Sequence, residues 1–365
     1  MKNINWWKPD FSKNKGNILK NVLSSNFVNE GKYTQKFESE ISKLLNAKFC
    51  TLTTSGTIAI FLALRSLGVG KEDEVLVPNF TFIATANAVR LCGAKPVFVD
   101  IDENNLGMDP KKIEIKISKK TKAIVVVHVS GRSANLNKII SLSKKHNLKI
   151  VEDAAEALYS KYDKNSFLGT LGDVGCFSLS PNKIISTGQG GIIVTNNKNI
   201  YENIKKLKDQ GRLSRGSGGD DIHNFEGYNF KFNDISAAIG LDQLKLIKKR
   251  KQKQIETFKF YKNNLNSKIL KLYNFNTINN IELPLWIDAT FTLKNIRFFF
   301  EYLQKKNIPI RKFWLPINKQ KVYFTKEIFS ITNKISKKSF WLPSSFDLNQ
   351  NQLNYICKTI NDYKE

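Results

Sequence analysis

The chain has 365 residues, of which 41% are hydrophobic and 25% are charged, with a formal net charge of +26 at pH 7. This composition excludes a disordered or collagen-like chain and provides enough apolar material for a buried sheet. At this length we expect one large and one small domain rather than a single compact core.

The excess of basic residues raises the question of a nucleic-acid or membrane partner, because clustered cations gain affinity by displacing counterions from phosphates. Here the lysines are spread along the whole chain. The densest run, residues 245–254, keeps apolar residues at helical spacing, so we expect its cations to form the exposed face of a helix. We predict no nucleic-acid or membrane partner, and keep a basic nucleic-acid-binding or regulatory protein as the alternative from a different class.

The chain shows no targeting segment and no metal-binding spacing. Residues 1–16 have no apolar core of signal-peptide length, and no later stretch approaches the roughly eighteen apolar residues of a membrane span. We therefore predict a cytoplasmic protein. The cysteines lack paired spacing and the histidines are scattered, which predicts free thiols and no metal site. These residues are Cys50, Cys92, Cys176, Cys357, His128, His146 and His223.

Between residue 50 and about residue 195, apolar runs rich in β-branched residues alternate with segments of helical period. Strands are predicted at residues 74–80, 95–101, 121–130, 148–157 and 172–180, with helices at 57–68 and 135–147. The Ala-Ile-Val-Val-Val run at residues 123–127 is typical of a strand buried on both faces. We expect a mostly parallel α/β sheet flanked by helices, with ligands bound beyond the carboxyl ends of the strands.

The C-terminal third has a different pattern. Residues 234–265 are predicted to form one long helix, with Asp234 at its N-cap, that leaves the sheet region. We place the domain boundary near residue 248. The prediction is a large α/β domain over residues 1–248, including the N-terminal segment, and a smaller α+β domain of short strands and amphipathic helices over residues 249–365.

Ser55, Gly56 and Thr57 stand at the start of a predicted helix. There the unpaired backbone N–H groups, the positive helix end and two hydroxyl groups can hold a phosphate. Taken alone, the same residues also fit a plain N-cap followed by a turn glycine. The phosphate interpretation therefore depends on other residues nearby.

A group of carboxylates follows the predicted strand at residues 148–157, where Glu152 and Asp153 are followed after two alanines by Glu156. A buried aspartate needs a cationic partner or it loses its charge. A protonated heteroaromatic nitrogen would suit Asp153, since the carboxylate favours the charged ring that withdraws electrons from a substrate carbanion. The alternative is an aspartate that caps the next turn.

Lys183 lies in a loop after Ser178 and before a turn with Gly188, Gly190 and Gly191 that leads into another strand. A lysine amine at this place can form a Schiff base, and Ser178 is a further candidate phosphate ligand. In a chain so rich in lysine, a solvated surface charge is the ordinary alternative for any single lysine.

Five motifs, SGTIAI, VPNFTFIATANAV, VEDAAEA, GCFSLSPNKIISTGQGG and GYNFKFNDISAAIGLDQL, occur in the order and spacing of the DegT/DnrJ/EryC1/StrS nucleotide-sugar aminotransferases. The chain resembles this family over nearly its whole length, more weakly after about residue 260. The resemblance implies a fold-type I pyridoxal-phosphate enzyme with a seven-stranded, mostly parallel sheet. It implies that Lys183 forms the Schiff base and that Asp153 pairs with the pyridine nitrogen. The residues implied to hold the phosphate are Ser55, Gly56, Thr57 and Ser178.

The resemblance also implies roles at the edges of the site. Phe82 matches the aromatic residue that stacks on the cofactor ring, with an ordinary core phenylalanine as the alternative, and Glu156 matches the residue near the ring hydroxyl. Asn229 matches an asparagine that reaches the phosphate from a second subunit, which implies a homodimer with shared active sites. His223, often His in the perosamine-synthase-like branch, is expected near the sugar unless it is a surface histidine. Arg311 is a candidate substrate-binding residue.

Two segments depart from the family pattern. Residues 128–136 contain Gly-Arg-Ser-Ala-Asn where many relatives have Gly-x-x-Ala-Asp, and residues 211–224 are unusually rich in glycine. These departures leave the substrate open and do not affect the expected cofactor. Loops near residues 130, 215 and 311–316 are expected to determine the substrate.

The resulting hypothesis is a ping-pong transamination from glutamate to the keto carbon of an NDP-4-keto-6-deoxyhexose, with C4 favoured over C3. The amino sugar would enter a surface polysaccharide or glycan. Lys183 serves as both anchor and acid–base group. The alternatives are the sugar dehydratase branch of the family, which has His in place of this lysine, and a pseudo-enzyme that binds without turnover.

Overall fold

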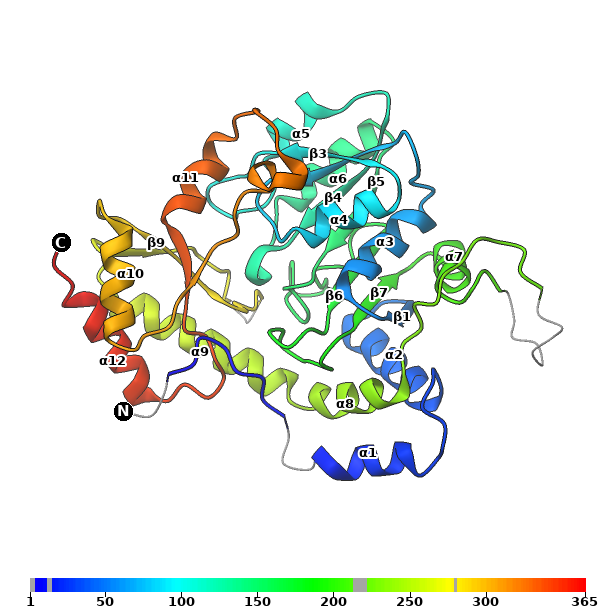
Figure 1. Ribbon diagram of the computed structural model, residues 1–365, viewed down its shortest axis with the longest axis horizontal. Helices are drawn as coiled ribbons and strands as arrows, with labels where there is room; N and C mark the ends of the chain where they lie inside the picture. Colours follow the sequence, from blue (N-terminus) through cyan, green and yellow to red (C-terminus); the bar gives the residue numbers. More distant parts are fainter. Residues whose placement is uncertain (1–3, 12–14, 213–221, 279–280) are drawn as a thin grey trace.

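A computed structural model describes residues 4–11, 15–212, 222–278 and 281–365 (Figure 1). The strands of its large sheet are β1 (Phe49–Thr53), β2 (Glu74–Pro78), β3 (Lys95–Val99), β4 (Thr121–Val127), β5 (Lys149–Asp153), β6 (Val174–Ser178) and β7 (Gly191–Thr195). Their order is β1-β7-β6-β5-β4-β2-β3. Only the two pairings of β7, with β1 and β6, are antiparallel. The predicted α/β class and the mostly parallel seven-stranded sheet are confirmed.

Each of the five predicted strands contains an observed strand, but all five end earlier than expected, β4 and β5 by the most. β4 stops at Val127, since Ser130 takes a left-handed backbone conformation with φ of 54° that a strand cannot contain. β5 stops at Asp153 because the next residues form turns, the first closed by the N–H of Ala157 bonded to the carbonyl of Ala154 at 2.8 Å. These early stops place functional side chains at the carboxyl edge of the sheet.

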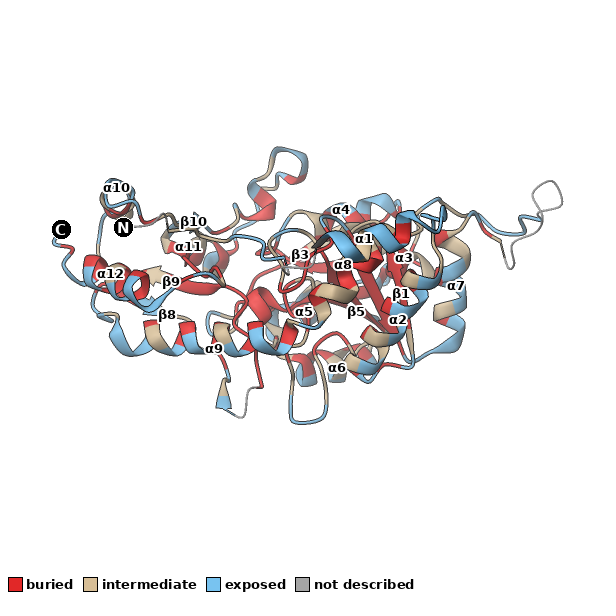
Figure 2. Cartoon of the chain, turned by 90° about the horizontal axis from the view of Figure 1, so that it is seen from below, coloured by how far each residue is buried: buried red, intermediate tan, exposed pale blue. Residues whose placement is uncertain are grey.

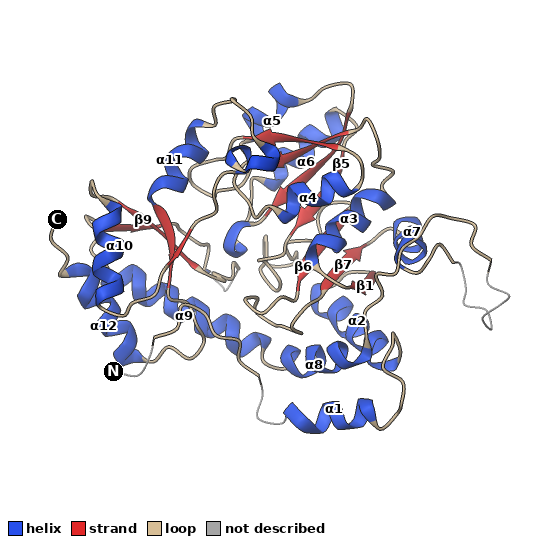
Figure 3. Ribbon diagram, viewed as in Figure 1, coloured by secondary structure: helices blue, strands red, loops and turns tan. Residues whose placement is uncertain are grey.

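Helices cover both faces of the large sheet (Figure 3). One face carries α3 (Gly56–Ser66), α4 (Ala84–Leu91) and α7 (Lys198–Lys208). The other carries α2 (Lys32–Leu45), α5 (Pro110–Lys116), α6 (Leu136–Lys145) and α8 (Asp234–Leu244), with α1 (Lys15–Leu23) packed on α8. Side chains alternate between the faces, so that Cys176 joins one core and Phe177 the other. The strands between these layers are buried (Figure 2).

The prediction of a single helix over residues 234–265 is wrong, because α9 (Ile247–Asn264) is separate from α8. At the break, the N–H of Leu246 bonds to the carbonyl of Gln243 at 3.0 Å, three residues back instead of four. The helix cap is also not Asp234 but Asn233, whose side chain accepts from the N–H of Ser236. The Asp234 carboxylate instead accepts hydrogen bonds from Gly31, Tyr33 and Thr34, so it fixes the start of α2.

The basic run at residues 245–254 is exposed only in part, and the expected fully exposed face is wrong at Arg250 and Lys251. They are 4% and 6% exposed, respectively. Arg250 donates to the carbonyl of Ile184 at 2.9 Å, and Lys251 donates to the carbonyls of Tyr159 and Ile281 at 3.2 and 3.1 Å. These two cations fasten α9 to the loops after β5 and β6 and to Ile281 in the C-terminal part of the chain, tertiary contacts that the helical period does not reveal.

The C-terminal part is an α+β unit of short strands and helices, as predicted. Its antiparallel sheet has the order β10-β11-β9-β8. Its elements are β8 (Leu270–Leu272), β9 (Ile287–Phe291), α10 (Ile296–Lys305), β10 (Arg311–Lys312), α11 (Ser330–Lys338), β11 (Ser339–Leu342) and α12 (Gln350–Asn361). Figure 1 shows α9 running from the large sheet toward α10 and α12. The division at residue 248 stays a prediction.

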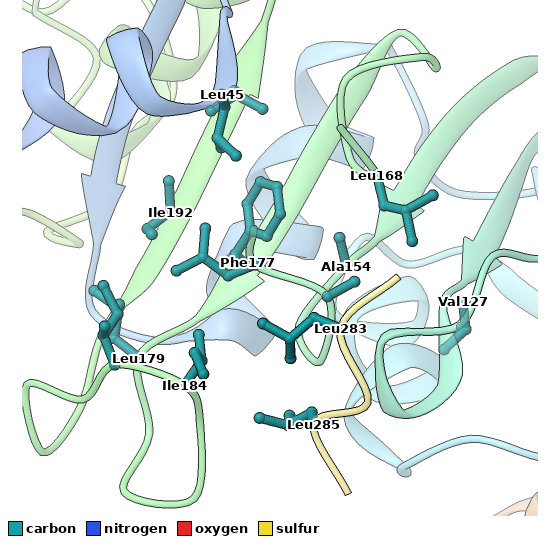
Figure 4. Close-up of a cluster of buried hydrophobic side chains, with 14 of the residues drawn as sticks. Leu45, Val127, Ala154, Leu168, Phe177, Leu179, Ile184, Ile192, Leu283 and Leu285 are labelled. Carbon is teal, nitrogen blue, oxygen red and sulfur yellow. The ribbon is translucent and has the colours of Figure 1, made fainter. Parts of the chain in front are cut away.

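Two segments distant in sequence join the C-terminal unit to the rest of the fold. The first is the N-terminal segment, where the N–H of Ser344 donates to the carbonyl of Trp6 at 2.9 Å. The second carries Leu283 and Leu285, which belong to the same buried hydrophobic cluster as Phe177 of the large sheet (Figure 4). The second segment thereby fixes the position of the residue that follows it, Trp286, which lines the functional site.

Within the described ranges, no helix is both long and apolar enough to cross a membrane. In the same part of the chain, no cluster of three or more His, Cys, Asp or Glu side chains is arranged to hold a metal ion. The four cysteines are free and buried.

Candidate active site

A cavity of about 330 Å³ lies at the carboxyl ends of the parallel strands, where the topology of an α/β sheet predicts a ligand. The start of α3, the segments after β2, β5 and β6, and aromatic residues of the C-terminal unit form its walls. The predicted site residues that line it are Ser55, Gly56, Thr57, Phe82, Asp153, Glu156, Ser178, Lys183 and Arg311.

One end of the cavity collects hydrogen-bond donors. Ser55 is the N-cap of α3, and its Oγ accepts from the N–H of Ile58 at 3.2 Å. The first N–H groups of a helix have no carbonyl partner within the helix, and they lie at its positive end. A Cβ on Gly56 would stand 3.0 Å from Cβ of Ser178, so glycine permits the close approach of α3 to the end of β6. Together with the hydroxyls of Thr57 and Ser178, this end suits a phosphate dianion.

Asp153 stands at the end of β5 and is 6% exposed. Its Oδ2 accepts from the Thr85 hydroxyl at 2.7 Å, and its Oδ1 accepts from the N–H of Ala155 at 3.2 Å. Burial raises the pKa of the carboxyl, and these two hydrogen bonds, with the smaller effect of the nearby Lys183, only partly offset the rise. Within the described residues, Asp153 forms no salt bridge. A buried carboxylate in this state favours a cationic ligand group.

Lys183 and Glu156 both line the cavity and form an ion pair. The Lys183 Nζ lies 3.5 Å from Oε1 of Glu156 and 4.8 Å from the centroid of the Trp286 ring. Glu156 also accepts from the N–H of Ser130 at 2.9 Å. Burial raises the pKa of the Glu156 carboxyl, and the Lys183 cation acts in the opposite direction. The Lys183 side chain is only 11% exposed, so it is not a solvated surface charge.

Glu152, the neighbour of Asp153, points away from the cavity. It accepts from the N–H groups of Gly169, Leu171 and Gly172 at 2.8, 2.7 and 2.6 Å, and lies 2.9 Å from Nε2 of His128. Although burial acts to raise the pKa of Glu152, these bonds outweigh burial and lower it. Glu152 therefore fixes the segment that leads into β6, and only the other two carboxylates line the cavity.

Sequence reasoning missed the aromatic wall of the cavity. Trp286, Trp314 and Trp341 line it, and Trp6 packs on Trp286 and Trp341 with ring centroids 5.7 and 6.3 Å apart. The Arg311 guanidinium lies 5.1 Å from the Trp6 centroid and 5.9 Å from that of Trp341. These tryptophans come from distant segments without a shared period. Their gathering at one place therefore leaves no local signal in the sequence.

Three residues remain from the predicted site: Phe82, His223 and Asn229. Phe82 lines the cavity and is 53% exposed, which leaves a flat apolar face available to a ring. His223 is exposed, with Nδ1 2.7 Å from the carbonyl of Gln210, and Asn229 forms an isolated bridge with Asp209. Neither lines the cavity of its own chain, so their predicted roles in a partner's site stay predictions. Most of the glycine-rich segment 211–224 lies outside the described residues.

Comparison with known proteins identifies the family of this chain. A family model described as the DegT/DnrJ/EryC1/StrS aminotransferase family matches residues 9–361. The chain belongs to this family. The predicted class of enzyme, an aminotransferase, is confirmed, and the family depends on pyridoxal phosphate.

Relatives are similar over their whole length. The GDP-perosamine synthase of Escherichia coli O157:H7 is 34% identical over 367 residues, which cover 100% of this chain and 99% of the relative. The dTDP-4-amino-4,6-dideoxy-D-glucose transaminase of Shigella dysenteriae is 32% identical over 93% of this chain and 92% of its own. Helicobacter pylori PseC, an aminotransferase involved in the biosynthesis of pseudoaminic acid, superposes with a TM-score of 0.88 at 25% identity over 98% of both chains.

The donor set of the cavity fits pyridoxal phosphate, the cofactor of the DegT/DnrJ/EryC1/StrS family. The start of α3 offers N–H groups and hydroxyls to a phosphate, and Lys183 offers a sheltered amine to an aldehyde. The uncompensated carboxylate of Asp153 matches a protonated ring nitrogen. All of these groups line the same cavity, as the binding of a single pyridoxal phosphate requires.

Proposed function

We propose that the protein transfers an amino group from glutamate to C4 of a nucleotide-linked 4-keto-6-deoxyhexose, with pyridoxal phosphate as its cofactor. One observation carries the proposal: the sheltered Lys183 amine and the buried, uncompensated Asp153 carboxylate face the same cavity. The names of the two similar curated proteins support a nucleotide-linked sugar as acceptor, and the second name supports amination at C4.

Each residue would hold one part of the cofactor. Ser55, Gly56, Thr57 and Ser178 bind the phosphate, Phe82 packs on the ring, Glu156 lies near the ring hydroxyl, Asp153 binds the ring nitrogen and Lys183 forms the covalent bond. When bound, pyridoxal phosphate withdraws electrons from the carbon that carries the amino group, and so makes its proton acidic.

The chain's own residues then handle the proton and the substrate. As a free amine, the Nζ of Lys183 would accept the proton from the donor carbon as a general base. Glu156, 3.5 Å away, keeps this amine directed at the cavity. The tryptophans form an aromatic wall for the sugar nucleotide, and Arg311 binds an anionic group of that substrate.

The proposed assembly is a homodimer with shared active sites, in which Asn229 and His223 reach the partner's cavity. The exposed position of His223 outside its own cavity is compatible with this role. The product would be an amino sugar for a surface polysaccharide such as an O-antigen, made in the cytoplasm.

The test supplies the purified protein and pyridoxal phosphate with glutamate labelled with heavy nitrogen and a panel of GDP-, dTDP- and UDP-linked 3-keto and 4-keto sugars. We expect one 4-keto sugar nucleotide to gain the heavy amino group at C4, shown by mass spectrometry and NMR, and no product without glutamate. Loss of water from the sugar would favour the dehydratase. No conversion, combined with salt-sensitive binding of DNA or RNA, would favour the nucleic-acid-binding alternative.

A further inference from the structure

Ser130 lies in the segment after β4 that departs from the family pattern, and its backbone is left-handed with φ of 54° and ψ of 19°. A residue other than glycine is strained in this region, and such strain persists only where the surroundings fix it. The side chain is fully buried. Its carbonyl accepts from the N–H of Leu285 at 2.9 Å, which ties it to the anchored C-terminal segment.

Every polar group of Ser130 has a partner. Its N–H donates to Oε2 of Glu156 at 2.9 Å, its hydroxyl donates to Oδ1 of Asp288 at 2.7 Å, and Oγ accepts from Nε1 of Trp341 at 3.2 Å. A hydroxyl has one donor and two acceptor sites, so donation to Asp288 leaves the lone pairs for Trp341. The hydroxyl is therefore held in one orientation.

Asp288 is fixed in turn by a buried ion pair. Nη2 of Arg132 donates to Oδ2 of Asp288 at 2.7 Å, and the guanidinium stacks on Phe275 at 4.0 Å from the ring centroid. Burial raises the pKa of the Asp288 carboxyl, and the Arg132 cation acts against this effect. Since each member of the network is bonded to the next, the network is rigid.

Ser130 thus connects two walls of the cavity. On one side, Glu156 faces the Lys183 amine. On the other, Trp341 lines the cavity and carries the Arg311 guanidinium against its ring. The backbone N–H of Ser130 serves the first wall and its hydroxyl serves the second, so the two contributions can be separated by substitution.

We propose that Ser130 is a positioning residue whose hydroxyl holds Trp341 in place as a wall for the sugar nucleotide, an inference that rests on the proposed function. The sugar nucleotide contains rings that pack on an aromatic face, whereas glutamate is small and has none. Loss of the hydroxyl therefore weakens use of the sugar nucleotide and leaves the reaction with glutamate intact.

The test compares Ser130→Ala and Ser130→Gly, which both lose the hydroxyl and keep the N–H that serves Glu156. In each variant we expect the KM and the calorimetric dissociation constant for the sugar nucleotide to rise about fivefold, as for the loss of one neutral hydrogen bond. The rate of the half-reaction with glutamate should stay unchanged. An effect in Ser130→Ala that is absent from Ser130→Gly would attribute the role to backbone strain and overturn the proposal.

Ser160→Ala is the matched control. The Ser160 hydroxyl is also fully buried; it donates to the carbonyl of Gly131 at 2.6 Å, beside Ser130, and accepts from the N–H of Leu283 at 2.9 Å. Neither of these two partners, both among the described residues, belongs to the aromatic wall. We expect this variant to lower the melting temperature without raising the KM for the sugar nucleotide. An equal rise in KM would reduce Ser130 to a general structural role and overturn the proposal.

A double-mutant cycle with Trp341→Phe tests the connection directly, because phenylalanine keeps an aromatic face and lacks the N–H. In the Trp341→Phe background, Ser130→Ala should add no further rise in KM, whereas additive effects would refute the coupling. If the wild-type protein itself fails to react with glutamate, the proposed function and this inference both fall. If the wild type reacts and Ser130→Ala leaves the KM unchanged, only this inference falls.

Discussion

Asparagine in place of Asp153 separates what the carboxylate does for the fold from what it does for the reaction. In the cofactor-free protein the carboxylate is buried, bonded to Thr85 and to the N–H of Ala155, and without a salt bridge among the described residues. Asparagine has the same size, and its oxygen can accept either bond without a charge to desolvate. We therefore expect Asp153→Asn to maintain or increase the free energy of unfolding of the cofactor-free protein.

The sign of this effect and its dependence on pH follow from proton linkage. Burial raises the pKa of Asp153 above its ordinary value of 3.8, so the folded protein keeps this proton to higher pH than the unfolded chain does. The resulting stability is present below pH 3.8 and is lost as the pH rises through the raised pKa. Asparagine has no charge to desolvate, so the gain in the variant should be largest at neutral pH and should disappear below pH 3.8, where the carboxyl of the wild type is also neutral.

The reaction changes in the opposite direction. Without the negative charge, the cofactor ring nitrogen loses the partner that keeps it protonated. We expect kcat to fall about 100-fold, or about 2.7 kcal/mol in the activation barrier.

Urea unfolding of the cofactor-free protein at about pH 4 and about pH 7, together with steady-state kinetics, measures both effects. Asp163→Asn is the control, because the N–H groups of Asn165 and Ser166 lower the pKa of exposed Asp163 and no gain in stability is expected there. A variant of Asp153 that retains full kcat, or that is strongly destabilised at neutral pH, would refute the reasoning.

Two further substitutions test the phosphate end and the buried lysine. In Gly56→Ala the new Cβ stands 3.0 Å from Cβ and 3.4 Å from Oγ of Ser178. We expect this variant to bind pyridoxal phosphate roughly tenfold more weakly, as measured by spectroscopic titration. Unchanged affinity would argue against this phosphate site. Burial, with a smaller effect of Lys161, lowers the pKa of Lys251 to about 8 from 10.5, so its contribution to stability is lost as the pH falls through about 8. The melting temperature of the wild type should therefore rise relative to that of Lys251→Met between pH 8 and pH 10.5. The control Lys249→Met, at an exposed position, should follow the wild type. Parallel curves for all three proteins would contradict this role of Lys251.

The sheet and the polar half of the site could be predicted from the sequence because both depend on local patterns. Buried parallel strands are continuous apolar runs, and the residues that follow them reach one edge of the sheet. Asp153 and Ser178 end such strands, and Lys183 follows one, so their meeting in one cavity needed only the topology. The motifs of the family then related these positions to a cofactor.

The aromatic wall and the burial of cations on α9 could not be predicted, because both arise from tertiary contacts. Trp6 and Trp341 stand at opposite ends of the chain and meet only through the folding of the N-terminal segment onto the C-terminal unit. Arg250 and Lys251 belong to a basic run whose period predicts exposure, yet loops of the large sheet cover them. Ser130 shows the same limit, since its left-handed backbone gives no signal in residue type.

The visible absorption spectrum of the purified protein with pyridoxal phosphate, before and after addition of glutamate, tests the central claim most directly. We expect an absorption band of lysine-bound cofactor in the wild type and in Lys164→Ala, whose side chain is exposed. Addition of glutamate should remove this band and form 2-oxoglutarate. Lys183→Ala should show neither the band nor the product. A Lys183→Ala protein that keeps both, or a wild-type band that does not respond to glutamate, would contradict the claim that Lys183 carries a glutamate-dependent transamination.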